Sequence, residues 1–315
     1  MSNPPLPFVS QSEDQERKRW VKALSVEMPE ENIVMFEDLS KADLEAARVA
    51  IVADPNPEWL KSMPNLVFVQ SLWAGVEKMM AEIGTAPYEV VRLEDPEMAE
   101  KMAEAILAWV LYLHRDMPTY AAQQRQKIWW ELDHTPAFGR RIGLIGLGKL
   151  GARAAEVLSG LGFSVAGWSR SPKTIPNVDC FHGSDTLHTM LSTVDIAVCV
   201  IPLTSATRHI VNEAALGAMP EGSKLINFAR GPIVDTTALL AALNNDHLAH
   251  AVLDVFDEEP LPVTSPLWDH PKVTLLPHIS APTNRQTGSK IVAGNIRAFR
   301  RDGTVPASVD RVRGY

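Results

Sequence analysis

The stretch RIGLIGLGKLGARAAEVLSGLGFSVAGWSR, from Arg141 to Arg170, has the residue order of a strand, a glycine-rich turn, a helix and a second strand. The apolar runs at 142–145 and 163–168 predict the strands, and the apolar residues between 154 and 161 recur at helical spacing. The turn GLGKLG (Gly146–Gly151) matches the GxGxxG pattern of dinucleotide-binding units. Because the turn lies between a strand and a helix, we expect such a unit. An ordinary β–α–β turn without a ligand is the alternative.

Each glycine of this turn has its own role in the predicted unit. Gly146 allows a tight turn out of the strand, and Gly148, which has no side chain, lets a pyrophosphate approach the backbone. Gly151 lets the helix pack closely against the strand. The helix then presents free N–H groups and the positive end of its dipole to the phosphates. The predicted phosphate site comprises these glycines together with Lys149 and Leu150.

Length and composition are those of an ordinary globular chain with room for two domains. The chain has 315 residues, 46% of them hydrophobic and 22% charged, a net charge of -8 and a pI of about 5.6. The acidic balance argues against binding to nucleic acid or an anionic membrane, and no apolar run has the length of a membrane span. The N-terminal stretch has no cationic start followed by an apolar core, so we expect no signal peptide.

The two cysteines indicate a reducing compartment. Cys180 and Cys199 lie in or beside apolar strand-like runs, so we expect buried free thiols in a cytoplasmic protein. Two thiols alone make no metal site, and we expect no bound metal.

Strand-like and helix-like runs alternate along most of the chain, and this alternation predicts parallel sheets covered by helices. Besides those of the glycine unit, the expected strands are 32–37, 48–53, 66–72 and 89–93, followed by 195–201, 224–229, 250–256 and 273–276. The expected helices are 14–28, 41–47, 97–115, 186–192, 213–219, 236–244 and 283–300.

This pattern predicts an α/β protein with two doubly wound parallel-sheet domains. The helix 97–115 is expected to bridge the domains, and the helix 283–300 is expected to return to the first domain. We therefore predict that residues 1–100 and 281–315 form one domain, into which residues 101–280 are inserted as a second domain.

Three polar residues directly follow apolar strands in the second half of the chain: Arg230, Glu259 and His278. Ligands of open α/β sheets bind beyond the carboxyl ends of the strands, so these residues are candidates for a site. Arginine binds a carboxylate through two parallel hydrogen bonds, and histidine exchanges protons near neutral pH. A nearby glutamate raises the pKa of a histidine. Each residue alone would more often be structural, but together they predict a dehydrogenase acting on a 2-oxo acid.

Several segments resemble the D-isomer-specific 2-hydroxyacid dehydrogenase family. RLEDPEM (Arg92–Met98) and VDRVRGY (Val309–Tyr315) are similar to its glyoxylate and hydroxypyruvate reductases in particular. The other matching segments are GLGKLG, IPLTSATRHIV (Ile201–Val211), NFARGPIVDTTAL (Asn227–Leu239), HAVLDVFDEEPLP (His250–Pro262) and SPLWDHPKVTLLPHIS (Ser265–Ser280).

The resemblance implies a Rossmann-type NAD(P) domain at 101–280 and a flavodoxin-like substrate domain. It makes Arg230, Glu259 and His278 the catalytic residues. Asp254 matches an aspartate that contacts the nicotinamide amide. His278 would also touch the cofactor and the substrate. Further cofactor contacts implied by the matching segments are Pro202, Leu203, Thr207 and Ala229.

The substrate carboxylate of the family is bound by backbone N–H groups of a short loop, and this loop matches Trp73-Ala74-Gly75-Val76. Arg230 would bind the same carboxylate. Trp73 is a departure, since a small residue is usual there. Trp73 would either narrow the pocket or point elsewhere, which leaves the size of the substrate open.

The adjacent tryptophans Trp129 and Trp130 suggest an interface or the rim of an active site, with packing on their own domain as the alternative. The resemblance implies a homodimer in which one of the two reaches the neighbouring subunit.

The far end of the glycine unit predicts NADPH rather than NADH. An NAD site usually has a carboxylate about 20 residues beyond the glycines. Here that place holds Ser169-Arg170-Ser171, with Lys173 nearby. A cation can pair with the 2′-phosphate of NADPH, and a serine hydroxyl can donate to it.

The sequence thus predicts NADPH-dependent reduction of glyoxylate to glycolate and of hydroxypyruvate to D-glycerate. One alternative is a relative that acts on pyruvate, phenylpyruvate or another 2-oxo acid. A second is a nucleotide-sensing binding protein without catalytic activity.

Overall fold

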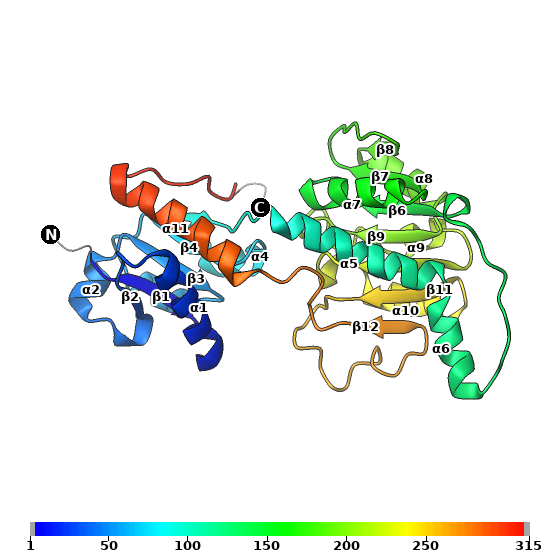
Figure 1. The fold of residues 1–315 in the computed structure, drawn as a ribbon, viewed down its shortest axis with the longest axis horizontal. Coiled ribbons are helices and arrows are strands. Elements are labelled where there is room, and N and C mark those ends of the chain that lie inside the picture. Colours follow the sequence, from blue (N-terminus) through cyan, green and yellow to red (C-terminus); the bar gives the residue numbers. More distant parts are fainter. Residues whose placement is uncertain (1–3, 312–315) are drawn as a thin grey trace. The chain divides into compact units, whose positions relative to one another are not determined.

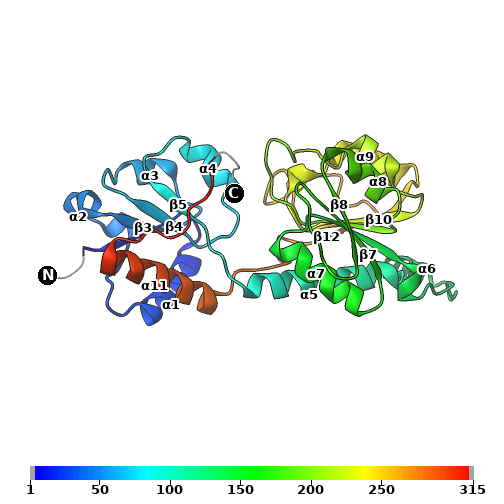
Figure 2. The same ribbon diagram turned by 90° about the horizontal axis from the view of Figure 1, so that it is seen from above.

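The computed structural model describes residues 4–311, so the last four residues of the VDRVRGY segment lie outside the described part. The chain forms two compact units (Figures 1 and 2). The described residues up to Glu97 and those from Thr283 onward form the first unit, and Met98–Pro282 form the second. No helix within residues 4–311 combines the length and apolar character that a membrane span requires.

The first unit contains a five-stranded parallel sheet in the order β2-β1-β3-β4-β5, which is the flavodoxin-like order. In Figure 2, α3 and α4 cover one face of this sheet, and α1 and α11 cover the other. Its strands are β1 (Leu6–Ser10), β2 (Ile33–Met35), β3 (Val49–Ala53), β4 (Phe68–Ser71) and β5 (Glu89–Val91). Its helices are α1 (Asp14–Glu27), α2 (Lys41–Ala46), α3 (Pro57–Lys61), α4 (Glu77–Ile83) and α11 (Arg285–Asp302).

Strand β1 was not predicted from the sequence, although it pairs with both β2 and β3 inside the sheet. The segment is rich in proline, which cannot donate a backbone hydrogen bond and is rare inside sheets. Pro7 is tolerated because pairing with β3 starts only at Phe8. All five residues of β1 are buried. The burial of this strand is a property of the assembled sheet and not of the local sequence.

Helix α11 joins the C-terminal segment to the first unit. Val292, Ala293, Ile296 and Phe299 belong to the same apolar cluster as Trp20 and Leu24 of α1. Arginines of α11 then bind carboxylates at the rim of this cluster: Arg285 binds Glu16, Arg297 binds Glu30 and Arg300 binds the buried Glu31. The amphipathic pattern of 283–300 therefore reflects packing on α1.

The second unit contains a seven-stranded parallel sheet in the order β12-β11-β10-β9-β6-β7-β8. Read from the other edge, this is the Rossmann order with one additional strand. Its strands are β6 (Arg141–Ile145), β7 (Ser164–Ser169), β8 (Val178–His182), β9 (Ile196–Cys199), β10 (Ser223–Asn227), β11 (Leu248–Leu253) and β12 (Val273–Leu275). Its helices are α5 (Glu97–His114), α6 (Met117–Gln126), α7 (Lys149–Gly160), α8 (Leu187–Leu191), α9 (Glu213–Ala218) and α10 (Thr236–Asn244).

Two apolar clusters cover the two faces of this sheet, one built with α5 and α7 and the other with α8, α9 and α10 (Figure 2). The strands and helices predicted in this half are confirmed, with ends that shift by a few residues. Two elements were missed. Strand β8 is an edge strand with partly exposed residues, and α6 is a polar helix without a buried residue. Neither has the periodic apolar pattern on which the prediction depended.

The α/β fold class with two doubly wound parallel sheets is thus confirmed.

The cysteine prediction is correct in part. Cys199 is fully buried, and burial raises the pKa of its thiol to about 12, whereas Cys180 is only partly buried. Both thiols are free.

Candidate active site

The turn between β6 and α7 has little room for side chains at its two ends. Gly146 has a φ of +120°, and a Cβ atom there would lie 2.5 Å from Cγ2 of Ile201. A Cβ atom on Gly151 would lie 1.8 Å from the carbonyl oxygen of Gly146. Both positions therefore require glycine.

Gly148, between them, differs from both. A Cβ atom on Gly148 would meet no heavy atom within 4 Å, so the backbone there faces open space. Lys149 is exposed beside it, and Leu150 is partly buried at the start of α7. This is the shape that a phosphate group requires if it is to approach the backbone at the start of a helix.

The turn lies at the point where the order of the sheet reverses. Strand β6 pairs with β7 on one side and with β9 on the other, and such a switch point is the usual ligand position in an open α/β sheet. The loop after β9 is fastened by Thr207, whose hydroxyl donates to the Pro202 carbonyl (2.8 Å) and accepts the Thr204 N–H (2.7 Å). Leu203, between them, is partly exposed.

The end of β7 carries two exposed cations. Arg170 and Lys173 are exposed, as is Ser171, and residues 169–173 include no carboxylate. Ser169 is buried, and its hydroxyl donates to the Ser171 carbonyl at 2.8 Å. Ser169 therefore shapes this turn, and Ser171 is the exposed hydroxyl.

Arg230 follows β10 in an extended conformation (φ −146°, ψ 152°) and precedes a short 3-10 turn, Gly231–Ile233. Asn227 holds this segment, because its side-chain amide donates to the Arg230 carbonyl (3.0 Å) and its oxygen accepts the Ala229 N–H (3.2 Å). The guanidinium donates to the carbonyl of Ala229 at 2.6 Å. Asn227 was not identified from the sequence, although an asparagine at the end of a strand is a recognisable turn signal.

Glu259 and His278 come from the segments that follow β11 and β12, and they form a pair. Nδ1 of His278 lies 2.7 Å from Oε2 of Glu259. The other carboxylate oxygen, Oε1, accepts the backbone N–H of Phe256 at 2.9 Å. Both side chains remain partly accessible, with exposed fractions of 51% for His278 and 36% for Glu259. A histidine held at Nδ1 leaves Nε2 as the atom available for proton transfer.

The electrostatics of this pair favour a charged histidine. The hydrogen bond to Glu259 and the charge of that carboxylate raise the pKa of His278 above its ordinary value, although burial and Arg230 oppose the shift. Burial raises the pKa of Glu259, but the hydrogen bonds from His278 and Phe256 and the charges of His278 and Arg230 outweigh it and hold the pKa low. Arg230 thus acts on both members of the pair.

Asp254 anchors the segment that carries the histidine. It is buried at the end of β11, and its two carboxylate oxygens accept the N–H groups of Ile279 (2.7 Å) and Ser280 (2.9 Å). Its carbonyl accepts the N–H of His278 at 3.0 Å. His278 itself has a φ of +53°, a left-handed conformation that is uncommon for residues other than glycine. These bonds hold His278 in that conformation.

The predicted substrate loop belongs to the first unit and follows β4. Among residues 4–311, none accepts a hydrogen bond from the backbone N–H groups of Ala74, Gly75 and Val76. Trp73 is held away from these groups. Its indole N–H donates to Asp54 at 3.2 Å, and its ring packs edge-on against Trp20 with 5.8 Å between centroids. The side chain therefore packs toward α1.

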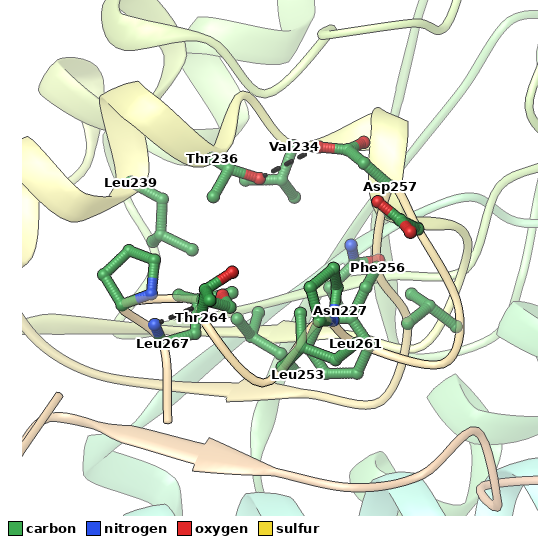
Figure 3. A pocket seen from close by; sticks show the side chains of 16 residues that line it. Asn227, Val234, Thr236, Leu239, Leu253, Phe256, Asp257, Leu261, Thr264 and Leu267 are labelled. Carbon is green, nitrogen blue, oxygen red and sulfur yellow. Dashed lines mark hydrogen bonds between the residues drawn. The ribbon is translucent and has the colours of Figure 1, made fainter. Parts of the chain in front are cut away.

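A largely apolar cavity of about 320 Å³ lies beside the segments that carry Arg230 and Glu259 (Figure 3). Thr236 donates to Asp257 across one side of it, as Figure 3 shows, at 3.3 Å. Arg230, Glu259 and His278 do not line this cavity. The cavity is therefore distinct from the site of the His278–Glu259 pair.

Trp129 and Trp130, which follow α6, are 95% and 68% exposed. Packing on their own domain, which was the alternative from the sequence, is therefore wrong within this chain. They line a shallow hollow of about 450 Å³ together with Tyr120 and Ile128.

The structure thus brings Arg230, Asp254, Glu259 and His278 together in the second unit, whereas Trp73 to Val76 belong to the first unit. Within residues 4–311, no three His, Cys, Asp or Glu side chains are grouped so that they could hold a metal ion.

Comparison with known proteins identifies the family of the chain. Residues 107–280 match the family model of the D-isomer specific 2-hydroxyacid dehydrogenase NAD-binding domain. The chain is 37% identical over 306 residues to the glyoxylate/hydroxypyruvate reductase A of Yersinia enterocolitica, covering 95% of this chain and 97% of that protein.

Two solved structures are similar over nearly the whole chain. A D-isomer specific 2-hydroxyacid dehydrogenase from Xanthobacter autotrophicus, in complex with NADPH and MES, is 39% identical with a TM-score of 0.91, covering 99% of this chain and 100% of that one. An NADPH-dependent glyoxylate/hydroxypyruvate reductase from Sinorhizobium meliloti, in complex with NADP and sulfate, is 28% identical with a TM-score of 0.90, covering 99% of each chain. The family model and these relatives place the chain in the D-isomer-specific 2-hydroxyacid dehydrogenase family, a family of oxidoreductases.

Proposed function

We propose that this protein is an NADPH-dependent reductase of small 2-oxo acids, which converts glyoxylate to glycolate and hydroxypyruvate to D-glycerate. The observation that carries the proposal is the 2.7 Å pair of His278 and Glu259 at the carboxyl end of a Rossmann sheet. The second unit is then the cofactor domain and the first the substrate domain. The two free cysteines are consistent with a cytoplasmic enzyme.

The cofactor is NADP(H), and when bound it supplies the hydride that reduces the carbonyl carbon. The open backbone at Gly148 and the start of α7 suit its pyrophosphate, with Lys149 and Leu150 beside them. The exposed Arg170, Ser171 and Lys173 suit the 2′-phosphate, because the same turn lacks the carboxylate that would bind the ribose of NADH. The remaining predicted cofactor contacts are Gly146, Gly151, Ser169, Pro202, Leu203, Thr207, Ala229, Asp254 and His278.

The substrate is held by its carboxylate. The N–H groups of Gly75 and Val76, in the loop that begins with Trp73 and Ala74, donate to one part of it. Arg230, whose guanidinium presents several N–H donors in one plane, binds the carboxylate and polarises the neighbouring carbonyl. An anionic substrate needs such local donors because the chain as a whole carries a net charge of -8.

His278 supplies the proton. In the direction of reduction the imidazolium donates from Nε2 to the carbonyl oxygen as negative charge develops there. Glu259 keeps the ring oriented through Nδ1 and stabilises the charged form before the transfer. Asp254 positions His278 through the backbone of residues 278–280.

Steady-state kinetics with glyoxylate, hydroxypyruvate, pyruvate and phenylpyruvate, each with NADPH and NADH, test this function. We expect turnover of the first two substrates with NADPH. Preferred turnover of pyruvate or phenylpyruvate would assign the protein to another branch of the family. Absence of turnover with all four would favour a nucleotide-binding protein without catalytic activity.

The exposed aromatic surface after α6 is proposed to be the subunit contact of a homodimer. The near-complete exposure of Trp129 is unusual for an indole, and Trp130 and Tyr120 extend the same surface. Light scattering of the wild type and of a variant with both tryptophans changed to serine tests this assignment. A dimer that persists in the variant would contradict it.

A further inference from the structure

The carboxyl edge of the first sheet is acidic, with one exception. Each of the five strands is followed by a short segment at this edge, and the first three residues of these segments include Glu13, Glu37, Asp38, Asp54 and Glu94. Within the part of the chain that the structure describes, Arg92 is the sole lysine or arginine in these positions. A cation at the edge where an anionic substrate would bind calls for an explanation.

Arg92 lies beside the loop that follows β4. The backbone N–H of Leu93 donates to the carbonyl of Trp73 at 3.0 Å, which extends the pairing of β5 and β4 past the ends of both strands. Side chains alternate between the faces of a strand, so Arg92 lies on the face of Val90, and Leu93 on the opposite face. Val90 packs in one apolar cluster with Val76 and Met79 of the α4 side, whereas Leu93 packs with Trp20. Arg92 therefore shares its face of the sheet with Val76.

A neighbouring carboxylate, that of Glu94, fixes the position of the Arg92 guanidinium. Its Nε and Nη2 both donate to Oε1 of Glu94, at 3.2 and 2.8 Å, and its side chain is 33% exposed. Within residues 4–311, Nη1 has no hydrogen-bond partner. Asp54 of this edge has a structural partner, because it accepts the indole N–H of Trp73. Asp95, which follows Glu94, accepts a hydrogen bond from the hydroxyl of Thr287.

The simplest alternative is a solvated surface pair, which would contribute little to stability. The position of this pair argues for a role in the site. Val90 and Arg92 are separated by roughly 7 Å along the strand, so Arg92 lies just beyond the buried cluster that contains Val76. A substrate whose carboxylate rests on the N–H groups of Gly75 and Val76 would have its next substituent near this guanidinium.

We infer that Arg92 and Glu94 recognise a hydroxyl group at C3 of the substrate, and so select 3-hydroxy-2-oxo acids. This inference rests on the proposed function. The pair offers a donor from the guanidinium and an acceptor from the carboxylate, which together match one hydroxyl group. A second carboxylate at this place would meet the negative charge of Glu94, and a hydrogen or methyl group would make no hydrogen bond with either member of the pair.

The test compares hydroxypyruvate, which has the C3 hydroxyl, with glyoxylate, which has no C3. Arg92→Gln should lower kcat/KM for hydroxypyruvate about 10- to 100-fold, the usual effect of losing a hydrogen bond to a charged group. Its kcat/KM for glyoxylate should change less than about threefold. Lys61→Gln is the matched control, since it removes a cation from another exposed ion pair of the same unit.

Glu94→Gln provides a second, independent measurement. It removes the negative charge and keeps the shape, so the ratio of kcat/KM for oxaloacetate to that for hydroxypyruvate should rise about tenfold as repulsion of the second carboxylate is lost. Thermal midpoints and NADPH binding of both variants should equal those of the wild type, which separates recognition from misfolding.

The outcomes distinguish this inference from the proposed function. Suppose that the wild type reduces both substrates. If Arg92→Gln then lowers kcat/KM for both substrates equally, or changes kcat/KM for neither, the C3 assignment is wrong and the proposed function stands. If the wild type reduces no 2-oxo acid, both are wrong.

Discussion

Nδ1 of His278 lies 2.7 Å from Oε2 of Glu259, and the second oxygen of the same carboxylate is fixed by the backbone N–H of Phe256. The glutamate is therefore oriented before it meets the histidine. Because the pair joins the segments after β11 and β12, small changes at either strand end would alter the proton donor.

Glu259→Gln should move the pH profile of the reduction. Glu259 raises the pKa of His278, and reduction requires the protonated ring, so turnover falls as the pH rises through that raised pKa. Without the carboxylate the pKa falls, and the descending limb of kcat/KM should move to lower pH, with roughly 100-fold slower turnover at pH 8. Glu258→Gln, at the exposed neighbouring carboxylate, should leave the profile in place. An unchanged profile in Glu259→Gln would contradict the role of the pair.

His278→Ala should abolish most turnover while NADPH still binds. General acid catalysis by a positioned side chain contributes about 100- to 10,000-fold, and kcat should fall within that range. Fluorescence titration should show NADPH affinity within about tenfold of the wild type, since the phosphate-binding turn is untouched. Turnover near the wild-type rate would refute the assignment of His278 as proton donor.

Arg170→Asp should invert the cofactor preference. The guanidinium at the end of β7 is exposed, and no carboxylate lies within residues 169–173. An aspartate there would repel a 2′-phosphate and accept hydrogen bonds from a ribose. The ratio of kcat/KM for NADPH to that for NADH should fall at least about 100-fold, the scale of a lost charged pair and a gained repulsion. Lys22→Asp, at an exposed cation of α1, is the control, and an equal ratio in both variants would exclude Arg170 from the site.

Gly151→Ala and Gly160→Ala should have opposite effects although both lie in α7. A Cβ atom on Gly151 would overlap the Gly146 carbonyl at 1.8 Å, whereas one on Gly160 meets no heavy atom within 4 Å. We expect Gly151→Ala to lower the free energy of unfolding by roughly 1–3 kcal/mol and to weaken NADPH binding. Gly160→Ala should raise it by about 0.5–1 kcal/mol. Urea unfolding measures both, and equal stabilities would contradict the packing of the turn.

His250 should make the fold sensitive to acid. Burial, together with the positive charges of Lys224 and His270, lowers the pKa of His250 to about 4. Between pH 6.5 and pH 4 the unfolded chain binds a proton there and the folded chain does not, so stability falls as the pH falls. The free energy of unfolding at pH 4 should be lower than at neutral pH by on the order of 3 kcal/mol. His250→Gln should lose less stability than the wild type between pH 7 and pH 4.5, and His182→Gln, at an exposed histidine, should behave like the wild type.

The elements that were predicted correctly are those whose signal is local. The alternation of apolar runs located most strands of both sheets, and the glycine turn with its flanking strand and helix was recognisable from residue types alone. Strand β1 and helix α6 were not predicted, because the first lies in a proline-rich segment and the second in a polar segment, and neither segment has a periodic apolar pattern. Their structures depend on neighbours that are distant in the sequence.

For the site, residue order identified Arg230, Glu259 and His278 as candidates, because parallel strands bring their carboxyl ends to one edge. Sequence alone determined which chemical groups gather there and that no carboxylate follows β7. Only the tertiary structure decided that Asp254 fastens the backbone of the histidine segment, that the Trp73 indole turns to Asp54, and that Arg92 pairs with Glu94 beside that loop. Hydrogen bonds and side-chain directions depend on distances between segments, and these exist only once the sheets have formed.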